Sequence, residues 1–204
     1  TWKSRGLGDV YKRQSLLIEL VERLIDEGLF PKDTRDTYAA EYTAWTNREG
    51  GYQEYIDAMV HAYMQNIRGV HYGDLARAGE AVVKEQSKKV YKYTRDLVHA
   101  LKKKDFYIVA ISQSPKTILD EFCTSHGFDK VYGRLYELGP RDLLTGEMID
   151  SHIIQNKADI VKRVRDQGGI TLEGSIGVGD TEGDITLLES VENPICFNPN
   201  QGYI

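Results

Sequence analysis

Hydrophobic residues recur at helical spacing through the first half of the chain. The segment 15–28 carries six aliphatic residues on one helical stripe, and Gly28 and Pro31 follow as stop signals. The stripe consists of Leu16, Leu17, Leu20, Val21, Leu24 and Ile25. Similar spacing predicts four more helices, over 34–47, 52–68, 74–83 and 94–104. Asp74 and Thr94 are the expected N-caps of the last two.

The hydrophobic pattern changes after residue 105. The continuous apolar run "FYIVAI", residues 106–111, is typical of a strand buried on both faces. A helix is expected next, with Ser114 as its cap, Pro115 in its first turn and Gly127 at its end. The apolar segments "KVYGRLYEL" and "GEMIDSHII" flank a turn-rich stretch, which indicates an antiparallel pair.

The last third of the chain alternates between helical and strand patterns. A basic helix is predicted over 157–167, ending at Gly168 and Gly169. The strand "SIGVG", a short helix over 184–191 and the strand "PICF" complete the pattern. Strands that alternate with helices in this way predict a parallel α/β sheet. The chain is thus expected to have a mostly helical block, 15–104, followed by an α/β part, 105–204.

Composition narrows the class of protein. The 204 residues are 41% hydrophobic and 28% charged, which is typical of a globular protein. A net charge of −5 argues against a general nucleic-acid binder, because phosphate backbones need a basic face. No apolar run is long enough to span a membrane, so the cytoplasm is the expected location. The two cysteines, Cys123 and Cys196, lie in apolar runs and are expected to be buried free thiols.

Four polar residues stand where a parallel sheet presents its binding edge. Ser112 follows the strand 106–111, Asp180 follows "SIGVG" with Asp184 four residues on, and Lys157 opens the basic helix. Ligands of such sheets bind beyond the carboxyl ends of the strands. A hydroxyl and an ammonium suit a phosphate group, and paired carboxylates suit a magnesium ion.

Each of these residues also has a purely structural interpretation. Ser112 could be an ordinary loop residue, and Lys157 a solvated lysine on a helix surface. Asp180 could serve a turn, and Asp184 could cap the short helix that follows. The order of all four residues, in these strand contexts, favours the functional interpretation.

The segments "VAISQSP" and "GVGDTEGDITLLESVENPICFNPN", with Lys157 between them, resemble the haloacid dehalogenase superfamily. The resemblance covers about 15–200 and is to the phosphoserine-phosphatase-like branch. It implies a three-layer, Rossmann-like α/β core with an inserted helical cap, which would be the block 15–104. It also implies a magnesium-dependent phosphatase acting on a small phosphorylated metabolite. Ser112 and Lys157 would be the catalytic and substrate-binding residues. Asp180 and Asp184 would serve the metal, and Asp184 would also orient Lys157.

One element of that family's pattern is missing from the chain. The family's nucleophile is the first aspartate of a D-x-D-x-T motif at the end of the first core strand, and this sequence contains no D-x-D. The motif would fall near Gly6 and Gly8, where "TWKSR" does not supply an apolar strand. Residues 1–14 are therefore expected to be foreign to the protein, and the C-terminus to be truncated. The chain as written is expected to be inactive and poorly folded.

The substrate is left open by the sequence, as is the oligomeric state. Phosphoserine phosphatases carry a recognition glutamate close to the position of Ser15, and the cap offers Arg68 as a weaker candidate. Two other functions remain possible at this stage. The chain could be a phosphate-binding or regulatory module without turnover, or a response-regulator-like phosphoacceptor, although the large helical block has no place in the latter.

Overall fold

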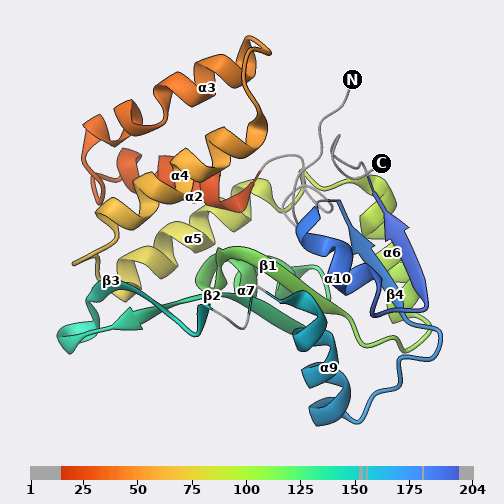
Figure 1. Cartoon of the computed structure of the whole chain (residues 1–204). Coiled ribbons are helices and arrows are strands. Elements are labelled where there is room, and N and C mark those ends of the chain that lie inside the picture. Colours follow the sequence, from red (N-terminus) through yellow and green to blue (C-terminus); the bar gives the residue numbers. More distant parts are fainter. Residues whose placement is uncertain (1–14, 152–153, 155, 181, 198–204) are drawn as a thin grey trace.

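A computed structural model describes residues 15–151, 154, 156–180 and 182–197 of the chain. Helices α2 to α5 gather on one side, and the strands lie beside them with α6, α9 and α10 (Figure 1). The helices of this first group are α2 (Leu16–Asp26), α3 (Ala39–Thr46), α4 (Tyr52–Asn66) and α5 (Tyr72–Gln86). None of the described helices is long and apolar enough to cross a membrane.

Helix α2 confirms the amphipathic pattern of the sequence. All six aliphatic residues of its predicted stripe are buried, at most 6% exposed. The helix begins where the Ser15 hydroxyl accepts a hydrogen bond from the Leu17 amide, which satisfies an amide that has no partner within the helix. Its buried stripe packs against α4, α5 and α7 (Lys116–Ser125), so α2 lies at the centre of the hydrophobic core.

Three helix starts differ from the prediction. The expected helix 34–47 is a 3-10 turn, Lys32–Thr37, followed by α3, because the backbone of Tyr38 leaves the helical region (φ −126°). Helix α5 begins two residues before Asp74, since the His71 imidazole accepts the capping bond from the Gly73 amide. Helix α6 (Lys92–Lys102) likewise begins before Thr94, whose hydroxyl instead donates to the Tyr91 carbonyl.

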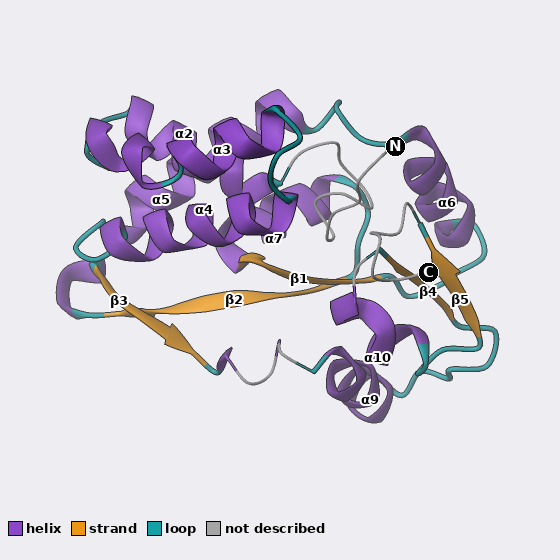
Figure 2. Ribbon diagram, turned by 45° about the horizontal axis from the view of Figure 1, so that its top comes forward, coloured by secondary structure: helices purple, strands orange, loops and turns teal. Residues whose placement is uncertain are grey.

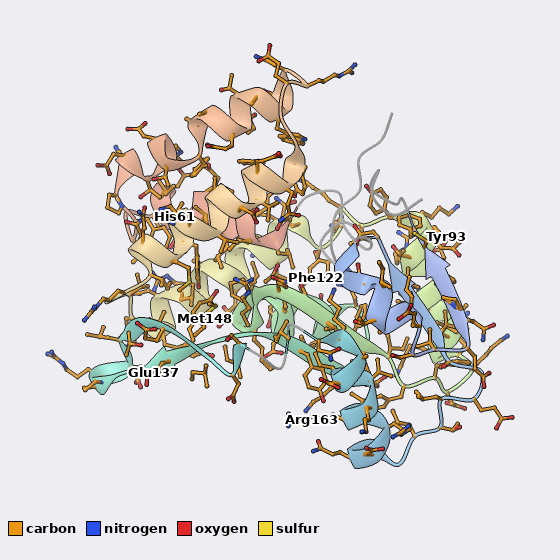
Figure 3. The ribbon with its side chains drawn as sticks, in the orientation of Figure 1. His61, Tyr93, Phe122, Glu137, Met148 and Arg163 are labelled. Atoms are coloured by element: carbon orange, nitrogen blue, oxygen red, sulfur yellow. The ribbon has the colours of Figure 1, made fainter. Side chains whose placement is uncertain are left out.

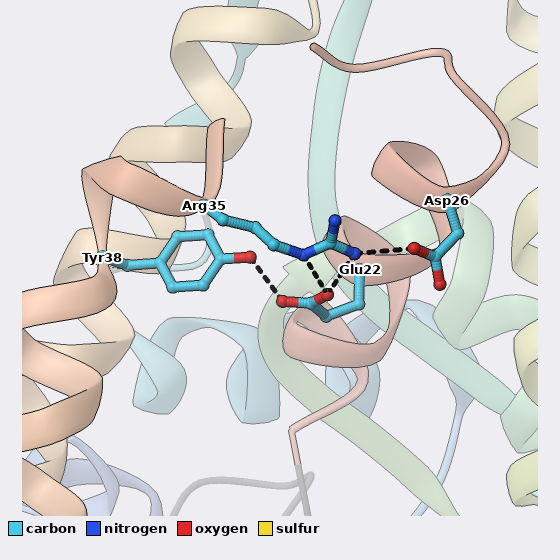
Figure 4. Close-up of polar contacts among 4 residues, drawn as sticks. All are labelled: Glu22, Asp26, Arg35 and Tyr38. Atoms are coloured by element: carbon cyan, nitrogen blue, oxygen red, sulfur yellow. Dashed lines mark hydrogen bonds and ion pairs between the residues drawn. The ribbon is translucent and has the colours of Figure 1, made fainter. Parts of the chain in front are cut away.

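A polar cluster joins the 3-10 turn and Tyr38 to α2 (Figure 4). The Arg35 guanidinium donates to Glu22 at 2.8 and 3.0 Å and to Asp26 at 2.6 Å. The Tyr38 hydroxyl donates to the same Glu22 carboxylate. Burial and this hydrogen bond raise the pKa of Tyr38. The cluster therefore holds the 3-10 turn and Tyr38 against α2.

The strands form parallel pairs with an antiparallel extension. Strand β1 (Val109–Pro115) pairs in parallel with β2 (Lys130–Leu138), and β2 pairs antiparallel with β3 (Leu144–Ile149). Strand β4 (Ile176–Gly179) pairs in parallel with β5 (Asn193–Cys196). Helix α6 lies on one side of these strands, and α9 (Lys157–Gly168) and α10 (Ile185–Leu188) lie on the other (Figure 2). The predicted α/β class and the antiparallel excursion are confirmed.

The first strand and its following helix start later than predicted. Strand β1 begins at Val109 rather than at 106, because the Ile108 amide donates to the Asp129 carboxylate instead of to a neighbouring strand. The strand continues to Pro115, and α7 begins at Lys116 without a side-chain cap. Ser114 is therefore not the helix cap; its amide donates to the Ser112 hydroxyl. Gly127 ends α7 in the left-handed region, as expected. The predicted helix 184–191 is shorter, Ile185–Leu188, and follows a 3-10 turn over Glu182–Asp184.

The described strands belong to two separate sheets. One has the order β1-β2-β3 and the other consists of β4 and β5. The main cluster of buried hydrophobic residues runs from Leu16 to Leu144 and includes Ala110 and Val131 of the first sheet. Within the described residues, this cluster contains none from α9, α10 or the second sheet. In the part of the chain that the structure describes, the two sheets therefore do not share one continuous core.

The Asp129 side chain links α6 to the residue before β1 by hydrogen bonds. Its carboxylate accepts hydrogen bonds from the Lys102 ammonium at 2.7 and 2.9 Å and from the Ile108 amide at 2.7 Å. Desolvation raises the pKa of Asp129, but these two donors outweigh it, and the net shift lowers the pKa from 3.8.

We expect Asp129→Asn to lower the free energy of unfolding by about 1 kcal/mol at pH 7, since the group is partly exposed. Because the pKa of Asp129 is lower in the folded protein than in the unfolded chain, its carboxylate stabilises the fold at pH values above the unfolded pKa. This contribution is lost as the pH falls through the folded-state pKa. Urea denaturation at pH 7 and pH 3 would measure it. Asp96→Asn, at an exposed position on α6, is the control. A difference from the parent that is equal at both pH values would contradict the assignment.

Candidate active site

The four predicted site residues are buried although all are polar. Ser112 is 5% exposed, Lys157 7%, Asp180 1% and Asp184 4%. They make up four of the seven buried polar or charged residues in the described part of the chain. Burial of a charged group is costly unless the group is paired or has a function. The structural interpretation of Lys157 as a solvated lysine is therefore wrong.

Three of the four residues lie together at the end of β4. The Lys157 ammonium donates to one oxygen of the Asp184 carboxylate, in a buried ion pair. The other oxygen of Asp184 accepts from the Asp180 amide at 3.1 Å. Lys157 is placed by the start of α9, where the Asn156 side chain caps the helix by accepting from the Ala158 amide. Two carboxylates and one ammonium thus share a buried position at a carboxyl strand end.

Gly179 allows this close arrangement. A Cβ atom at residue 179 would lie 2.4 Å from the Cβ of Asp184, which is closer than two side chains can approach. Any other residue at this position would displace Asp184 from the Asp180 amide. The sequence analysis did not assign a role to Gly179. The Gly-Asp pair at the end of a strand was the available signal, because glycine is needed where other groups approach the backbone closely.

Ser112 lies inside β1, not after the strand as predicted, and it is separate from this cluster. It is buried, and its hydroxyl accepts from the Ser114 amide at 3.2 Å. Within the described residues, Ser112 makes no direct hydrogen bond to Lys157 or Asp184. A cavity of about 460 Å³ has Ile111 on one wall and Asp180 and Asp184 on another. Strand β1 and the end of β4 therefore border the same opening.

The donor set fits part of a magnesium site. Magnesium binds oxygen ligands and is commonly held by one or two carboxylates together with substrate phosphate and water. Asp180 and Asp184 supply carboxylate oxygens, but both oxygens of Asp184 already accept hydrogen bonds. Among the described residues, no three His, Cys, Asp or Glu side chains gather closely enough to hold a metal. Asp180 is therefore the better candidate ligand, and further oxygen ligands are required.

Three other residues from the sequence analysis have no part in this role. Cys123 is buried and free, as expected, whereas Cys196 is exposed, so that prediction is wrong for Cys196. Cys196 pairs with Gly179 across the second sheet. Burial, followed by the charges of Asp180 and Asp184, raises the pKa of its thiol. Arg68 follows α4, and a Cβ atom at residue 146 in β3 would lie 3.3 Å from the Arg68 Cβ.

Comparison with known families identifies the architecture. Residues 14–189 match the family described as haloacid dehalogenase-like hydrolase. The chain belongs to this family. The match spans most of the chain, including all four buried site residues. The resemblance inferred from the sequence motifs is therefore confirmed. No curated protein matches the chain closely enough to add a more specific assignment.

Several solved structures show the same fold. A protein of unknown function from Bordetella pertussis Tohama I is 15% identical, with a TM-score of 0.69 over 92% of this chain and 84% of that chain. A substrate-bound phosphoserine phosphatase is 14% identical, with a TM-score of 0.61 over 96% and 84%.

A hydrolase of the same family from Salmonella enterica serovar Typhi is 14% identical, with a TM-score of 0.64. The match covers 96% of this chain and 61% of that chain, so the chain spans less than two thirds of that hydrolase's length. At these identities the likeness establishes the fold. The fold is that of the phosphoserine-phosphatase-like branch of this hydrolase family.

Proposed function

We propose that this haloacid dehalogenase-like hydrolase is a magnesium-dependent phosphatase for a small phosphorylated metabolite of the cytoplasm. The observation that carries the proposal is the buried Lys157–Asp184 pair beside Asp180, at the carboxyl end of β4. An ammonium held by one carboxylate next to a second carboxylate can bind a phosphate and a cation together. The fold shared with a substrate-bound phosphoserine phosphatase supports this choice of reaction.

The residues of this chain would act on the phosphoryl group from two sides. The Ser112 hydroxyl would donate a hydrogen bond to one phosphoryl oxygen, and the Lys157 ammonium would offset the negative charge that grows on the others. Asp184 would hold the Lys157 side chain in place through the ion pair that the structure shows. Asp184 is therefore a positioning residue for Lys157.

Asp180 would be the ligand of the magnesium ion, with Asp184 next to it. When bound, the ion would neutralise charge on the phosphate. The nucleophile in our proposal is the first aspartate of a D-x-D-x-T motif on a strand preceding Ser15. Its carboxylate would attack phosphorus and release the alcohol, and water would then release phosphate from the aspartyl-phosphate. This chain has no D-x-D, so we propose that it is inactive as written.

The helical block 15–104 is proposed to be the cap, which would cover the substrate and exclude water. The position of α6 argues for a cap that ends before residue 104, because α6 lies beside the strands rather than with α2 to α5 (Figure 1). The main hydrophobic cluster also joins α2, α4 and α5 to α7 and β1. A cap that moves as a unit would therefore have to separate from α7.

The test is a phosphatase assay on two chains. One is the 204-residue chain, and the other is the same chain from Ser15 onward, preceded by an apolar strand that ends in D-x-D-x-T. We expect only the second to hydrolyse p-nitrophenyl phosphate, in a magnesium-dependent manner. Replacing its first motif aspartate by asparagine is the control and should abolish turnover. Equal activity of the two chains, or a folded and inactive second chain, would overturn the proposal.

Ser112→Ala in the restored chain should lower kcat/KM by about a hundredfold, because one hydrogen-bond donor to the transition state is removed. Ser114→Ala is the matched control, since it removes a neighbouring hydroxyl that the proposal does not use. Steady-state kinetics would measure both variants, and vanadate inhibition should weaken in parallel with the loss. Unchanged kinetics for Ser112→Ala would show that Ser112 does not contact the phosphoryl group.

A second candidate function is phosphate binding without turnover. The observation that favours it is the sequence itself, which contains the proposed phosphate-binding residues without a D-x-D motif. Isothermal titration of the 204-residue chain with inorganic phosphate would test it. Binding that is lost in Lys157→Met and kept in Lys162→Met, a change at an exposed position of the same helix, would support this function.

A further inference from the structure

A small second cavity lies beside the carboxyl end of the β1–β2 pair. It measures about 50 Å³ and is lined by Gln113, Arg134, Met148, Ser151 and Ile154. We call it the Arg134 pocket. Met148 marks its place on the hairpin of β2 and β3 in Figure 3. Because about 10–15 Å³ of such volume holds one water molecule, the pocket has room for one small group of a few atoms.

The pocket borders both halves of the proposed phosphate site. Gln113 directly follows Ser112 in β1, so their Cα atoms are about 3.8 Å apart. Ser151 and Ile154 belong to the segment that leads from β3 into α9, and α9 begins at Lys157. Ser112 and Lys157 are the two residues proposed to bind the phosphoryl group. A molecule bound by them would therefore lie close to this pocket.

Strand pairing and side-chain contacts hold Arg134 in the wall of the pocket. Arg134 stands opposite Pro115 in the last pair of the β1–β2 ladder. Its guanidinium donates to the Gln113 amide oxygen at 2.5 Å and lies 3.9 Å from the Met148 sulfur. Burial raises the pKa of the Tyr136 hydroxyl, and the Arg134 guanidinium nearby opposes that rise. The groups that position the guanidinium are therefore neutral.

The charge of Arg134 determines the kind of group that the pocket can bind. Other arginines of the described chain pair with carboxylates, among them Arg23, Arg35 and Arg77. Arg134 is half-buried and has neutral contacts in the same part of the chain. Its N–H donors form a planar fork that matches the oxygens of a carboxylate or a phosphate. Because the Gln113 oxygen accepts from Arg134, the NH2 group of Gln113 can donate to the same ligand.

Given the proposed phosphatase function, on which this inference rests, we propose that the Arg134 pocket binds a second anionic group of the substrate. The substrate is then a phosphomonoester with a carboxylate or a second phosphate on a short linker. The Arg134 guanidinium, the Gln113 NH2 group and the Ser151 hydroxyl are the donors to that group. Arg134 is thus a specificity-determining residue, and it lies on a core strand rather than in the helical block.

The first experiment compares substrates of matched length on the chain with the restored D-x-D-x-T strand. They are 3-phosphooxypropanoate, its uncharged amide and propane-1,3-diyl bisphosphate. We expect kcat/KM to be at least about tenfold higher for a charged substrate than for the amide, because the amide cannot form the charged pair with the guanidinium. A larger ratio for the acid identifies the group as a carboxylate, and a larger ratio for the bisphosphate identifies it as a phosphate.

Variants of Arg134 test the assignment through the ratio of kcat/KM for charged and amide substrates, because a general loss of folding or turnover affects both substrates equally. Arg134→Met should bring this ratio to within about twofold of unity. Arg134→Lys should give an intermediate ratio, since lysine keeps the charge without the fork. Arg163→Met, at an exposed position of α9 (Figure 3), is the control and should keep the parent's ratio. Equal ratios in Arg134→Met and the parent would overturn the inference.

A chemical readout tests the pocket without turnover. Phenylglyoxal modifies arginine side chains, and peptide mass spectrometry gives the rate at each one. In EDTA, the acid or the bisphosphate should slow the modification of Arg134 at least about tenfold, whereas the amide should not, and Arg163 should react at an unchanged rate.

The two readouts separate the pocket from the phosphatase function. Protection of Arg134 in a restored chain that does not hydrolyse p-nitrophenyl phosphate would support the pocket and remove the phosphatase function. Hydrolysis of p-nitrophenyl phosphate with neither protection nor selectivity would overturn the pocket alone. Absence of both hydrolysis and protection would overturn both.

Discussion

Asp180→Asn in the chain with a restored D-x-D-x-T strand should lower magnesium-dependent phosphatase activity by at least about a hundredfold. Asparagine keeps the shape of the side chain but removes the negative charge, and a hard cation is held chiefly by anionic oxygen. Asp180 is 1% exposed, and its backbone amide donates a hydrogen bond to Asp184. Its position is therefore fixed, and we do not expect a neighbouring carboxylate to take its place as a ligand.

The measurement for Asp180→Asn is the rate of p-nitrophenyl phosphate hydrolysis as a function of magnesium concentration. Activity should be partly recovered at high magnesium if the variant only weakens the binding of the ion. Asp166→Asn, an exposed position on α9, is the control and should behave as the parent does. Near-normal turnover of Asp180→Asn with an unchanged magnesium requirement would remove Asp180 from the proposed metal site.

Lys157→Met should lower the free energy of unfolding of the same restored chain by about 3–5 kcal/mol. Removal of the ammonium leaves the Asp184 carboxylate buried beside Asp180 without a compensating charge. For a domain of this size, such a loss corresponds to a fall in Tm of about 6–20 °C. Exposed ion pairs of this chain, such as Arg165–Asp166, contribute far less because water screens them.

Urea denaturation would measure the contribution of the ion pair to stability. The variants to compare are Lys157→Met, Lys162→Met and the double variant Lys157→Met/Asp184→Asn. Lys162 is exposed on the same helix, so its replacement should change stability little. The double variant should recover part of the loss, because the remaining buried group is neutral. A single variant Lys157→Met within about 1 kcal/mol of the parent would mean that the pair is weakly coupled.

Hydrophobic periodicity predicted the helices well and their starting residues less well. The stripe of α2 was visible, because it depends on residues close in sequence. The late start of β1 depends on a contact with Asp129, which is distant in the chain. The His71 cap was missed since the imidazole is a less usual capping group than the carboxylate of Asp74.

The candidate site was predicted as a set of residue types, and the structure adds their arrangement. Strand ends and spacing brought out Ser112, Lys157, Asp180 and Asp184, and all four are buried. The ion pair between Lys157 and Asp184 joins residues 27 positions apart, and only the resemblance to the family implied it. Glycine is needed at 179 because a Cβ atom there would lie 2.4 Å from the Cβ of Asp184. No pattern of hydrophobic positions in the sequence could show this distance.

The limited extent of the main hydrophobic cluster bears on local cooperativity. Because the cluster ends at Leu144, the second sheet and α9 are held to the rest of the described chain by fewer buried apolar contacts. Regions with few such contacts open at a lower free energy than the whole molecule unfolds. Asp180 and Asp184 lie in this weakly held part. A ligand that binds this region only when the region is folded would therefore raise the free energy of its local opening. The same ligand would leave the stability of the helical core around α2 unchanged.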